Sequence, residues 1–183
     1  MEVRGAFSRH DARQCALQVL YAIEVGRQEP KAVFDDLVHK GQDRHLAFAR
    51  RLVSLAHKNR QAMDDHIAAR AEHWDLDRIA LLDRLILRLA LCELLYVEDV
   101  PPKVSINEAI DLAKAFSTDQ SGRFVNGILD AFFNDHEAEI LRVKTTEANA
   151  GRARKKGCAA RGGGKEETGE VKRSKPKPGP GSG

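Results

Sequence analysis

The sequence predicts an all-α protein, and two observations carry that prediction. Apolar residues recur every three or four positions through most of the first 142 residues, which is the spacing of one face of an α-helix. No segment shows the alternation of apolar and polar residues that is typical of a half-buried β-strand. With 183 residues, the chain is long enough for one ordinary domain or two small ones.

The first two helices are expected near the N-terminus. One runs from Ser8 to Val25, with Ser8 as its N-cap and Gly26 as its stop signal. A short second helix is expected over Ala32–Val38 and ends before Gly41.

The middle of the chain predicts a long amphipathic segment followed by a buried helix. Asp43–Ala71 keeps the helical period and is expected to break once, near Lys58–Arg60. Asp77–Tyr96 is apolar nearly all round, and a helix of that kind is normally buried at the centre of a domain.

The next helix is expected to follow Pro101–Pro102, because proline cannot continue the preceding helix. Ser105 and Glu108 have the spacing of a capping box, and Val104 and Ala109 that of a hydrophobic staple. This helix is therefore expected to begin at Ser105 and to run to about Phe116.

The last helix, Arg123 to about Ile140, contains an unusual pair. Asn126-Gly127 is the strongest short signal for a hairpin turn, yet the apolar residues around it follow the helical period. Within a helix, the glycine alone costs about 1 kcal/mol relative to alanine. Ser117–Gly122 is expected to be the loop before this helix, with Ser121 or Asp119 as the cap.

The C-terminal segment differs in composition and charge. From Val143 onward there are 11 Lys and Arg against 4 Glu, which leaves 19 basic and 23 acidic residues in Met1–Arg142. Thr145–Gly183 is poor in large apolar residues, so we expect it to be disordered. We therefore divide the chain into a helical domain, 1–142, with subdomains of about 1–73 and 74–142, and a basic tail, 143–183. The tail either aids solubility or holds polyanions without sequence preference.

No catalytic residue, metal site or cofactor site is predicted. The seven histidines and three cysteines have no metal-ligand or redox spacing, and phosphate-binding and nucleophile motifs are missing. Reduced cysteines, no apolar run of membrane-spanning length and no signal peptide favour a cytoplasmic protein. The sequence favours a binding module over an enzyme.

Three stretches resemble the NusB family of bacterial transcription antitermination factors. They are RHDARQCALQVLY from Arg9, VPPKVSINEAIDLAK from Val100 and RFVNGILD from Arg123. The resemblance covers about Arg9 to Phe133. It implies a compact bundle of six or seven helices in two perpendicular three-helix subdomains that share the long apolar helix.

The resemblance also implies a function. NusB proteins bind the boxA element of ribosomal RNA transcripts, together with a ribosomal protein that doubles as the transcription factor NusE, and help RNA polymerase read through terminators. An alternative is a non-catalytic helical module for ribosomal RNA maturation, similar to the domain that precedes ribosomal RNA cytosine methyltransferases. Since family members occur as monomers or homodimers, a homodimer also stays open.

Candidate RNA-binding residues follow from matching the family pattern. They are Arg4, Arg9, His10, Arg13, Tyr21, Arg123 and Phe124. Family members have a denser basic run where this chain has His10 and Asp11, and fewer phosphate contacts would weaken RNA binding. Phe124 either packs in the core or points outward to stack on an unpaired base. Tyr21 has the same two alternatives.

Other candidates concern the protein partner and the packing of the helices. Asp83, Arg84 and Arg88 lie on the polar stripe of the central helix and are candidates for binding NusE. The motif residues Ser105, Asn107, Glu108, Asn126 and Gly127 are expected to be structural. Asn126 is expected to tie the Ser117–Gly122 loop, and Gly127 to allow close approach of another helix.

Overall fold

The computed structural model describes residues 8–26, 32, 44–71, 76–118 and 120–159. This part of the chain forms six α-helices and one short 3-10 helix, and it contains no strand, so the predicted all-α class is confirmed. The elements are α1 (Arg9–Gly26), α3 (Arg44–Lys58), α4 (Arg60–Ala68), η1 (Leu76–Arg78), α5 (Leu81–Tyr96), α6 (Pro102–Phe116) and α7 (Ser121–Ala159). All contacts between side chains and helices described here lie within one compact unit, Met1–Asn149. Three parts of the predictions lie outside the described residues: Arg4, residues 33–38 of the helix expected over Ala32–Val38, and residues 160–183 of the expected tail.

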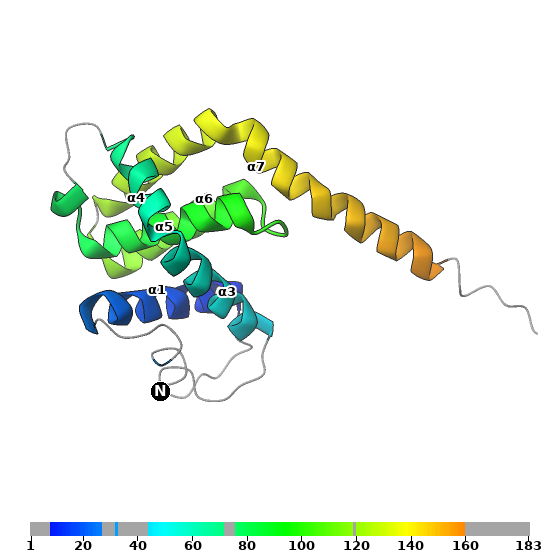
Figure 1. The fold of residues 1–183 in the computed structure, drawn as a ribbon, viewed down its shortest axis with the longest axis horizontal. Coiled ribbons are helices and arrows are strands. Elements are labelled where there is room, and N and C mark those ends of the chain that lie inside the picture. The colour runs from blue at the N-terminus through cyan, green and yellow to red at the C-terminus, as the bar shows by residue number, and fades with distance from the viewer. Residues whose placement is uncertain (1–7, 27–31, 33–43, 72–75, 119, 160–183) are drawn as a thin grey trace, which may run out of the picture. The chain divides into compact units, whose positions relative to one another are not determined.

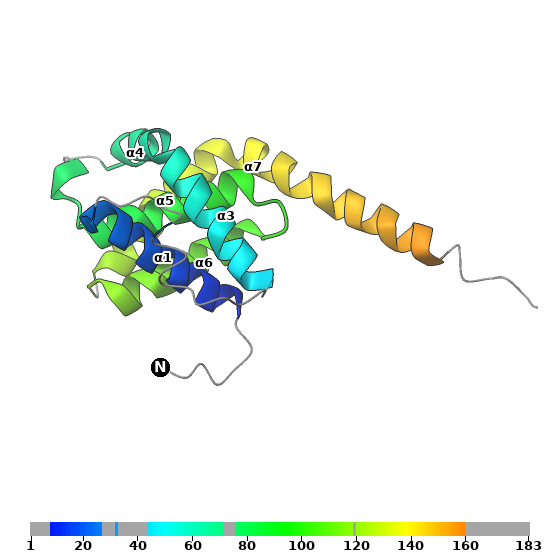
Figure 2. The ribbon, with the colours of Figure 1, turned by 60° about the horizontal axis from the view of Figure 1, so that its bottom comes forward.

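Helix α5 is the centre of the bundle, as its apolar sequence predicted. It contacts α1, α3, α4 and α6, and α1 in turn packs against α3 (Figures 1 and 2). Leu85, Leu87 and Leu91 are completely buried, as expected for a helix with neighbours on every side. It begins at Leu81, later than expected, because η1 occupies residues 76–78.

The start of α1 is held by the predicted cap. The Ser8 hydroxyl accepts a hydrogen bond from the Asp11 backbone N–H at 3.2 Å, and Asp11 Oδ2 accepts one from the Ser8 backbone N–H at 2.7 Å. This reciprocal pair satisfies two backbone donors that the first turn leaves free. The Ser8 hydroxyl also donates to Asp11 Oδ2 at 2.7 Å, and this bond, followed by the one from the Ser8 N–H, lowers the pKa of Asp11. The expected break after Lys58 is likewise confirmed, since α3 ends there and α4 begins at Arg60.

The capping box expected at Ser105 is wrong. Helix α6 begins at Pro102, with Pro101 as its N-cap, and the Ser105 backbone N–H already donates to the Pro101 carbonyl at 3.2 Å. Proline at the first helical position is pre-organised for the helix and lacks the N–H that would otherwise stay unsatisfied. Ser105 therefore lies inside the helix, and Val104 is 41% exposed rather than part of a staple.

Helix α7 is longer than expected at both ends. It begins at Ser121, where the Thr118 carbonyl accepts a hydrogen bond from the Ser121 N–H at 3.0 Å, and it continues past Ile140 to Ala159, with a kink at His136. The 137–150 stretch contains neither glycine nor proline, so no residue there stops the helix.

Two basic side chains close the C-terminal end of α5. Arg51 of α3 donates to the Tyr96 carbonyl at 2.7 Å, and Lys144 of α7 donates to the carbonyls of Glu93, at 2.9 Å, and Val97. The last carbonyls of a helix have no partners within it and carry partial negative charge, so cations stabilise them. Burial lowers the pKa of Lys144 to about 8.

Candidate nucleic-acid interface

The predicted basic residues of α1 are engaged within the fold. The Arg9 guanidinium pairs with Asp99 and lies 5.0 Å from the ring centroid of Phe48. His10 Nδ1 lies 2.8 Å from Glu108 Oε2. Both side chains stay about two-fifths exposed, 39% for Arg9 and 41% for His10. They can therefore still face a phosphate.

Arg13 is a structural residue. It is 4% exposed, and its Nε and Nη2 donate to the two carboxylate oxygens of Glu93 at 2.8 and 2.7 Å. Ser105 donates to Glu93 Oε1 at 2.7 Å, and Glu108 Oε2 lies 3.4 Å from Arg13 Nη1. The motif residues Ser105 and Glu108 thus join α6 to α1 and α5, whereas Asn107 is exposed. Because its guanidinium is enclosed by carboxylates, Arg13 cannot reach RNA in this structure.

Tyr21 and Phe124 are both accessible, from different helices. Tyr21 is 43% exposed, so its ring lies on the surface of α1 rather than in the core. Phe124 is half-buried. It packs against the core and also lines a pocket of about 250 Å³, so its ring is neither sealed in the interior nor fully exposed.

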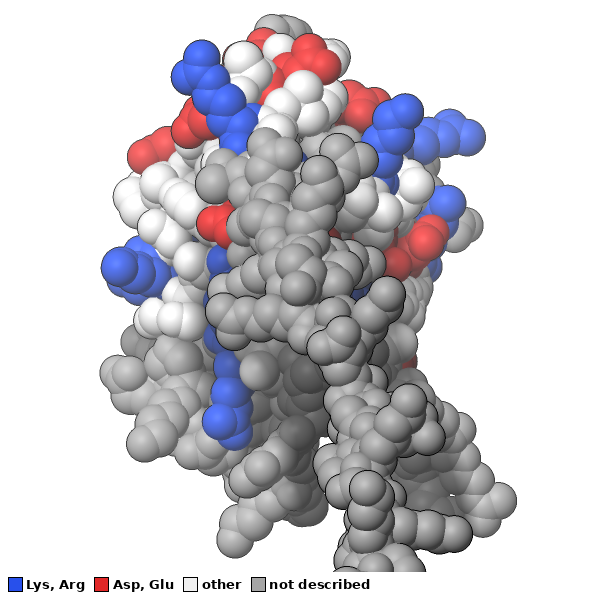
Figure 3. Space-filling model, turned by 90° about the vertical axis from the view of Figure 1, so that its right-hand side faces the viewer, with Lys and Arg blue, Asp and Glu red and all other residues white. Residues whose placement is uncertain are grey.

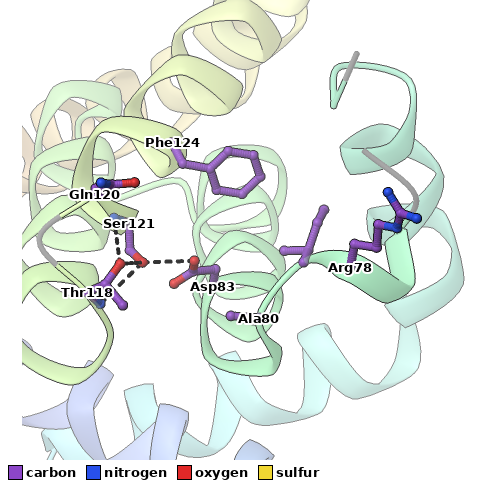
Figure 4. A pocket seen from close by; sticks show the side chains of 8 residues that line it. Arg78, Ala80, Asp83, Thr118, Gln120, Ser121 and Phe124 are labelled. Atoms are coloured by element: carbon purple, nitrogen blue, oxygen red, sulfur yellow. Dashed lines mark hydrogen bonds between the residues drawn. The ribbon is translucent and has the colours of Figure 1, made fainter. Parts of the chain in front are cut away.

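The pocket lies between the start of α5 and the start of α7. It is lined by Arg78, Ile79, Ala80, Asp83, Thr118, Gln120, Ser121 and Phe124. In Figure 4, Phe124 lies above Asp83, with Arg78 on one side and Thr118 and Ser121 on the other. The sequence singled out Phe124 and Asp83 as candidates without predicting a pocket, and it gave no signal for Arg78, which follows no recognisable motif.

Hydroxyl groups hold one wall of the pocket. Ser121 Oγ donates to Asp83 Oδ2 at 2.9 Å and lies 2.8 Å from Thr118 Oγ1. Asp83 is only 7% exposed, and its other oxygen, Oδ1, is buried and has no hydrogen-bond partner among the described residues. Asp83 was expected to lie on an exposed stripe for a protein partner, and its burial contradicts that expectation.

The other two candidates for binding the protein partner, Arg84 and Arg88, differ in burial. Arg88 is 6% exposed and donates to Asp64 through Nε at 2.6 Å and through Nη2 at 2.5 Å, and it also pairs with Glu24. Burial alone would lower the pKa of Arg88, but its hydrogen bonds to these carboxylates outweigh burial and raise it. Arg88 therefore stabilises the interior, whereas Arg84 is half-buried.

The candidate RNA-binding residues form two groups that lie well apart, one on α1 and one at the start of α7. Arg13 contacts Glu93, whereas Phe124 lines the pocket beside Asp83. These α5 residues are ten positions apart, which is about 15 Å along a helix. An RNA strand would have to follow the length of α5 to touch both the N-terminal arginines and Phe124.

Figure 3 shows basic and acidic side chains of the described residues on the same face, where they are interspersed. This agrees with the slight acidic excess of Met1–Arg142. RNA binding would therefore depend on local groups rather than on a general positive potential.

The Asn126-Gly127 pair does not act as expected. Asn126 Nδ2 donates to Asp130 Oδ2 at 2.7 Å, one turn along the same helix, rather than to the Ser117–Gly122 loop. A Cβ atom at Gly127 would meet nothing within 4 Å, so no other helix approaches it. The pair lies on an open face of α7, one turn beyond Arg123, which is also exposed.

Gly127→Ala should raise the free energy of unfolding by about 1 kcal/mol, because alanine favours the helix and has room at this position. Urea unfolding of the parent and the variant measures the difference. An unchanged or lower stability would mean that this position is not in an ordinary open helix.

A cluster of rings joins α4 to the kink of α7. The Phe132 ring stacks on His136 with centroids 4.3 Å apart, and His66 meets both rings edge-on, at 5.0 and 5.3 Å. Arg70 lies over Phe132 and donates to Asp135 Oδ2 at 2.7 Å. Burial, followed by the neighbouring His136 and Arg70, lowers the pKa of His66.

The depressed pKa of His66 predicts a loss of stability in acid. The unfolded chain binds a proton near pH 6.5, and the folded protein binds it only at lower pH, so folding weakens as pH falls through 6.5 toward the folded pKa. Urea unfolding at pH 7.5, 6.5 and 5.5 should show this fall in the parent, and a smaller one in His66→Gln. An equal fall in both proteins would exclude His66 as its source.

Two kinds of feature are absent from the described residues. No group of three or more His, Cys, Asp or Glu there is placed to hold a metal ion. Among the helices that the structure describes, none has the length and hydropathy of a membrane span.

Comparison with known proteins identifies the family. A model of the NusB family matches residues 10–134. The chain belongs to the NusB family. A transcription antitermination protein NusB from Chloroherpeton thalassium is 44% identical over 143 residues, which are 75% of this chain and 67% of that protein. The protein of the same name from Oceanobacillus iheyensis is 43% identical over 67% of this chain and 95% of its own length.

Solved NusB structures share the fold. NusB of T. maritima superposes with a TM-score of 0.63 at 33% identity, over 75% of this chain and 91% of that one. A chain from a structure of the antitermination factors NusB and NusE in complex with dsRNA gives a TM-score of 0.63 at 28% identity, over 69% of this chain and 96% of its own. The resemblance of the three sequence stretches is thereby confirmed for this NusB-family chain.

Proposed function

We propose that this NusB-family protein binds boxA-type single-stranded RNA together with NusE and acts in an RNA polymerase antitermination complex on ribosomal RNA operons. The family membership and the relative solved with NusE and RNA support this proposal. The observation that carries it is Phe124, a half-buried aromatic ring that lines a pocket and follows the exposed Arg123 in the sequence. Aromatic rings and cations are the usual means of holding unpaired bases and their phosphates.

Five of the candidate side chains are accessible, and we propose that these bind RNA. Arg9, His10 and Tyr21 on α1, with Arg123 and Phe124 on α7, have accessible side chains. Arg13 supports them from the interior by fixing α1 to α5. For NusE, Arg84 is the one candidate of the three on α5 that is not engaged in buried ion pairs or the pocket wall.

Titration with labelled RNA tests the function. BoxA-type RNA should bind more tightly than a scrambled sequence of equal length, and NusE should increase the difference, at both low and physiological salt. Equal binding of the two RNAs under every condition would reject the proposal. Light scattering with and without RNA would show whether a homodimer gives way to a complex.

Phe124→Ala should weaken boxA-type RNA binding by about 1–3 kcal/mol, the usual value of one aromatic–base stack. Tyr96→Ala is the matched control, because it removes an aromatic ring that is 38% exposed and does not line the pocket. Circular dichroism would establish that both variants fold. Parent-like affinity in a folded Phe124→Ala protein would make the ring a packing residue only.

A further inference from the structure

We propose that the basic tail, residues 143–183, is a second RNA-binding element, which holds the phosphates of the transcript next to the specifically bound segment without base preference. It acts beside Arg9, at the end of α5 where Lys144 fixes α7 to the domain. This inference rests on the proposed RNA-binding function and goes beyond it, because the family model matches residues 10–134 and does not reach the tail.

Lys144 attaches the start of the tail to the domain. Its Nζ donates to the backbone carbonyls of Glu93, at 2.9 Å, and Val97. Two residues after Val97, Asp99 pairs with Arg9 at the start of α1. Burial lowers the pKa of Lys144, whereas the charges of Glu93 and Asp99 raise it, so Asp99 is a near neighbour of the amine as well. The tail therefore leaves the domain beside the first turn of α1, where one of the two groups of candidate RNA-binding residues lies.

Four basic residues follow this anchor closely in the sequence, and residues 151–159 contain no Asp or Glu. We call these four the basic cluster: Arg152, Arg154, Lys155 and Lys156. Helix α7 continues through Ala159, and the i, i+3, i+4 spacing places Arg152, Lys155 and Lys156 on one side of it. Clustered charge of one sign binds a polyphosphate because the counterions of the nucleic acid are released.

The length of chain between the anchor and the basic cluster is short. Arg152 is eight positions beyond Lys144, and eight residues span about 12 Å as a helix and at most about 29 Å when fully extended. Connectivity alone therefore keeps the cluster close to the anchor. A binding element on so short a connection acts at high effective concentration on RNA that is already held at α1.

The charge balance argues against a role in solubility alone. Residues 1–142 carry a net charge of −4 and the tail carries +7, which leaves +3 for the whole chain. The magnitude of the net charge thus becomes slightly smaller, whereas solubility improves as the net charge moves away from zero. The tail instead reverses the sign, so that a chain whose domain repels RNA attracts it.

The domain itself offers few cations to phosphates near the anchor. The Arg9 guanidinium is shared with Asp99, and Arg13 is enclosed by Glu93 and Glu108. Phosphate contacts provide most of the sequence-independent part of RNA affinity. The tail therefore supplies a kind of contact that this end of the domain lacks.

The first test uses the full chain and changes only the RNA. The affinities of a short boxA-type RNA and of the same RNA extended by oligouridine at its 5′ or 3′ end are measured at low and physiological salt. At low salt, at least one extended RNA should bind about tenfold more tightly than the short one, because additional phosphates release counterions. A scrambled RNA with the same extension should gain by the same factor, since the tail does not read bases.

The second test neutralises the basic cluster in the full chain. The cluster variant carries Arg152→Gln, Arg154→Gln, Lys155→Gln and Lys156→Gln. It should lose the gain from the extension, and its slope of log affinity against log salt should fall by up to about 2.8, or about 0.7 for each lost contact. The preference for boxA-type over scrambled RNA should stay that of the parent.

A matched variant removes the same charge farther from the anchor. It carries Lys172→Gln, Arg173→Gln, Lys175→Gln and Lys177→Gln, which lie 28 or more positions beyond Lys144. Its effect should be much smaller, because effective concentration falls roughly as the −3/2 power of the length of the connection. Both variants leave Met1–Asn149 unchanged, so urea unfolding of the domain should match that of the parent.

The outcomes separate this inference from the function on which it rests. If the short boxA-type RNA binds specifically but no extension adds affinity, or the cluster variant keeps the gain, the tail inference is overturned and the function stands. Tighter RNA binding by the cluster variant would overturn it too, because the tail would then cover the acidic domain. If an extension adds affinity but boxA-type and scrambled RNA bind equally, the tail inference stands and the proposed function fails.

Two comparisons test the position and the partner. Equal effects of the near and the distant charge removals would overturn the placement beside Arg9. A polyaspartate peptide that binds the parent as tightly as oligouridine of equal charge would overturn RNA as the partner and assign the tail to acidic proteins.

Discussion

Replacing Glu93 by alanine should lower the free energy of unfolding by about 3–5 kcal/mol, the usual cost of removing one partner from a buried ion pair. Glu93 is 3% exposed and accepts hydrogen bonds from Arg13 at 2.7 and 2.8 Å and from Ser105 at 2.7 Å. Without Glu93, the buried guanidinium of Arg13 keeps one carboxylate neighbour, Glu108, at 3.4 Å. Since α1, α5 and α6 meet at this carboxylate, the loss should appear as one cooperative shift in urea unfolding.

Two further variants test whether the loss of stability comes from the broken ion pair rather than from replacing a glutamate within a helix. Glu137→Ala removes a carboxylate from an exposed position of α7 and should change stability by less than about 0.5 kcal/mol. The double replacement Arg13→Met with Glu93→Leu should recover much of the loss, because apolar residues of similar size can replace a buried pair. A mild effect of Glu93→Ala alone would show that water reaches the guanidinium.

Arg88→Ala should be about as damaging, again by about 3–5 kcal/mol. The guanidinium joins α5 to Asp64 of α4 and to Glu24 of α1, so its removal leaves two carboxylates facing each other without a cation. Their repulsion would be relieved by protonation, and the variant should therefore lose less stability at pH 5 than at pH 8.

Two further variants serve as comparisons for Arg88→Ala: Arg88→Lys and Arg60→Ala. Lysine keeps the charge but cannot form the two parallel bonds to Asp64, so its effect should lie between those of the parent and Arg88→Ala. Arg60 is exposed at the start of α4, and its replacement should be nearly neutral. Near-parent stability of Arg88→Ala would assign the residue to the surface, as the sequence first indicated.

The helices could be predicted because their signals are local. Periodicity located α1, the break at Asn59 and the buried α5, and Ser8 was identified as a cap from its position alone. At α6 two local signals competed. Pro102 at the first helical position prevailed over the Ser105 spacing, which matches a capping box without forming one.

The candidate site was only partly predictable, because charges that pair across the fold are not visible in sequence. Arg13 pairs with a carboxylate 80 positions away in the sequence, and Arg88 pairs with one 24 positions away. The sequence alone therefore suggested that both arginines lie on the surface. Phe124 was located through the family resemblance, and its accessible ring required coordinates. Arg78 lies in η1, which the sequence did not predict, and only the pocket reveals it.

The Lys144 contacts have a practical consequence for shortening the chain. A protein truncated after Arg142, where the composition changes, would lose the amine that binds the Glu93 and Val97 carbonyls. Its central helix would then unravel more readily at that end, in the same turn that carries the Arg13–Glu93 pair. Any version designed for crystallisation or NMR should therefore stop well beyond residue 144.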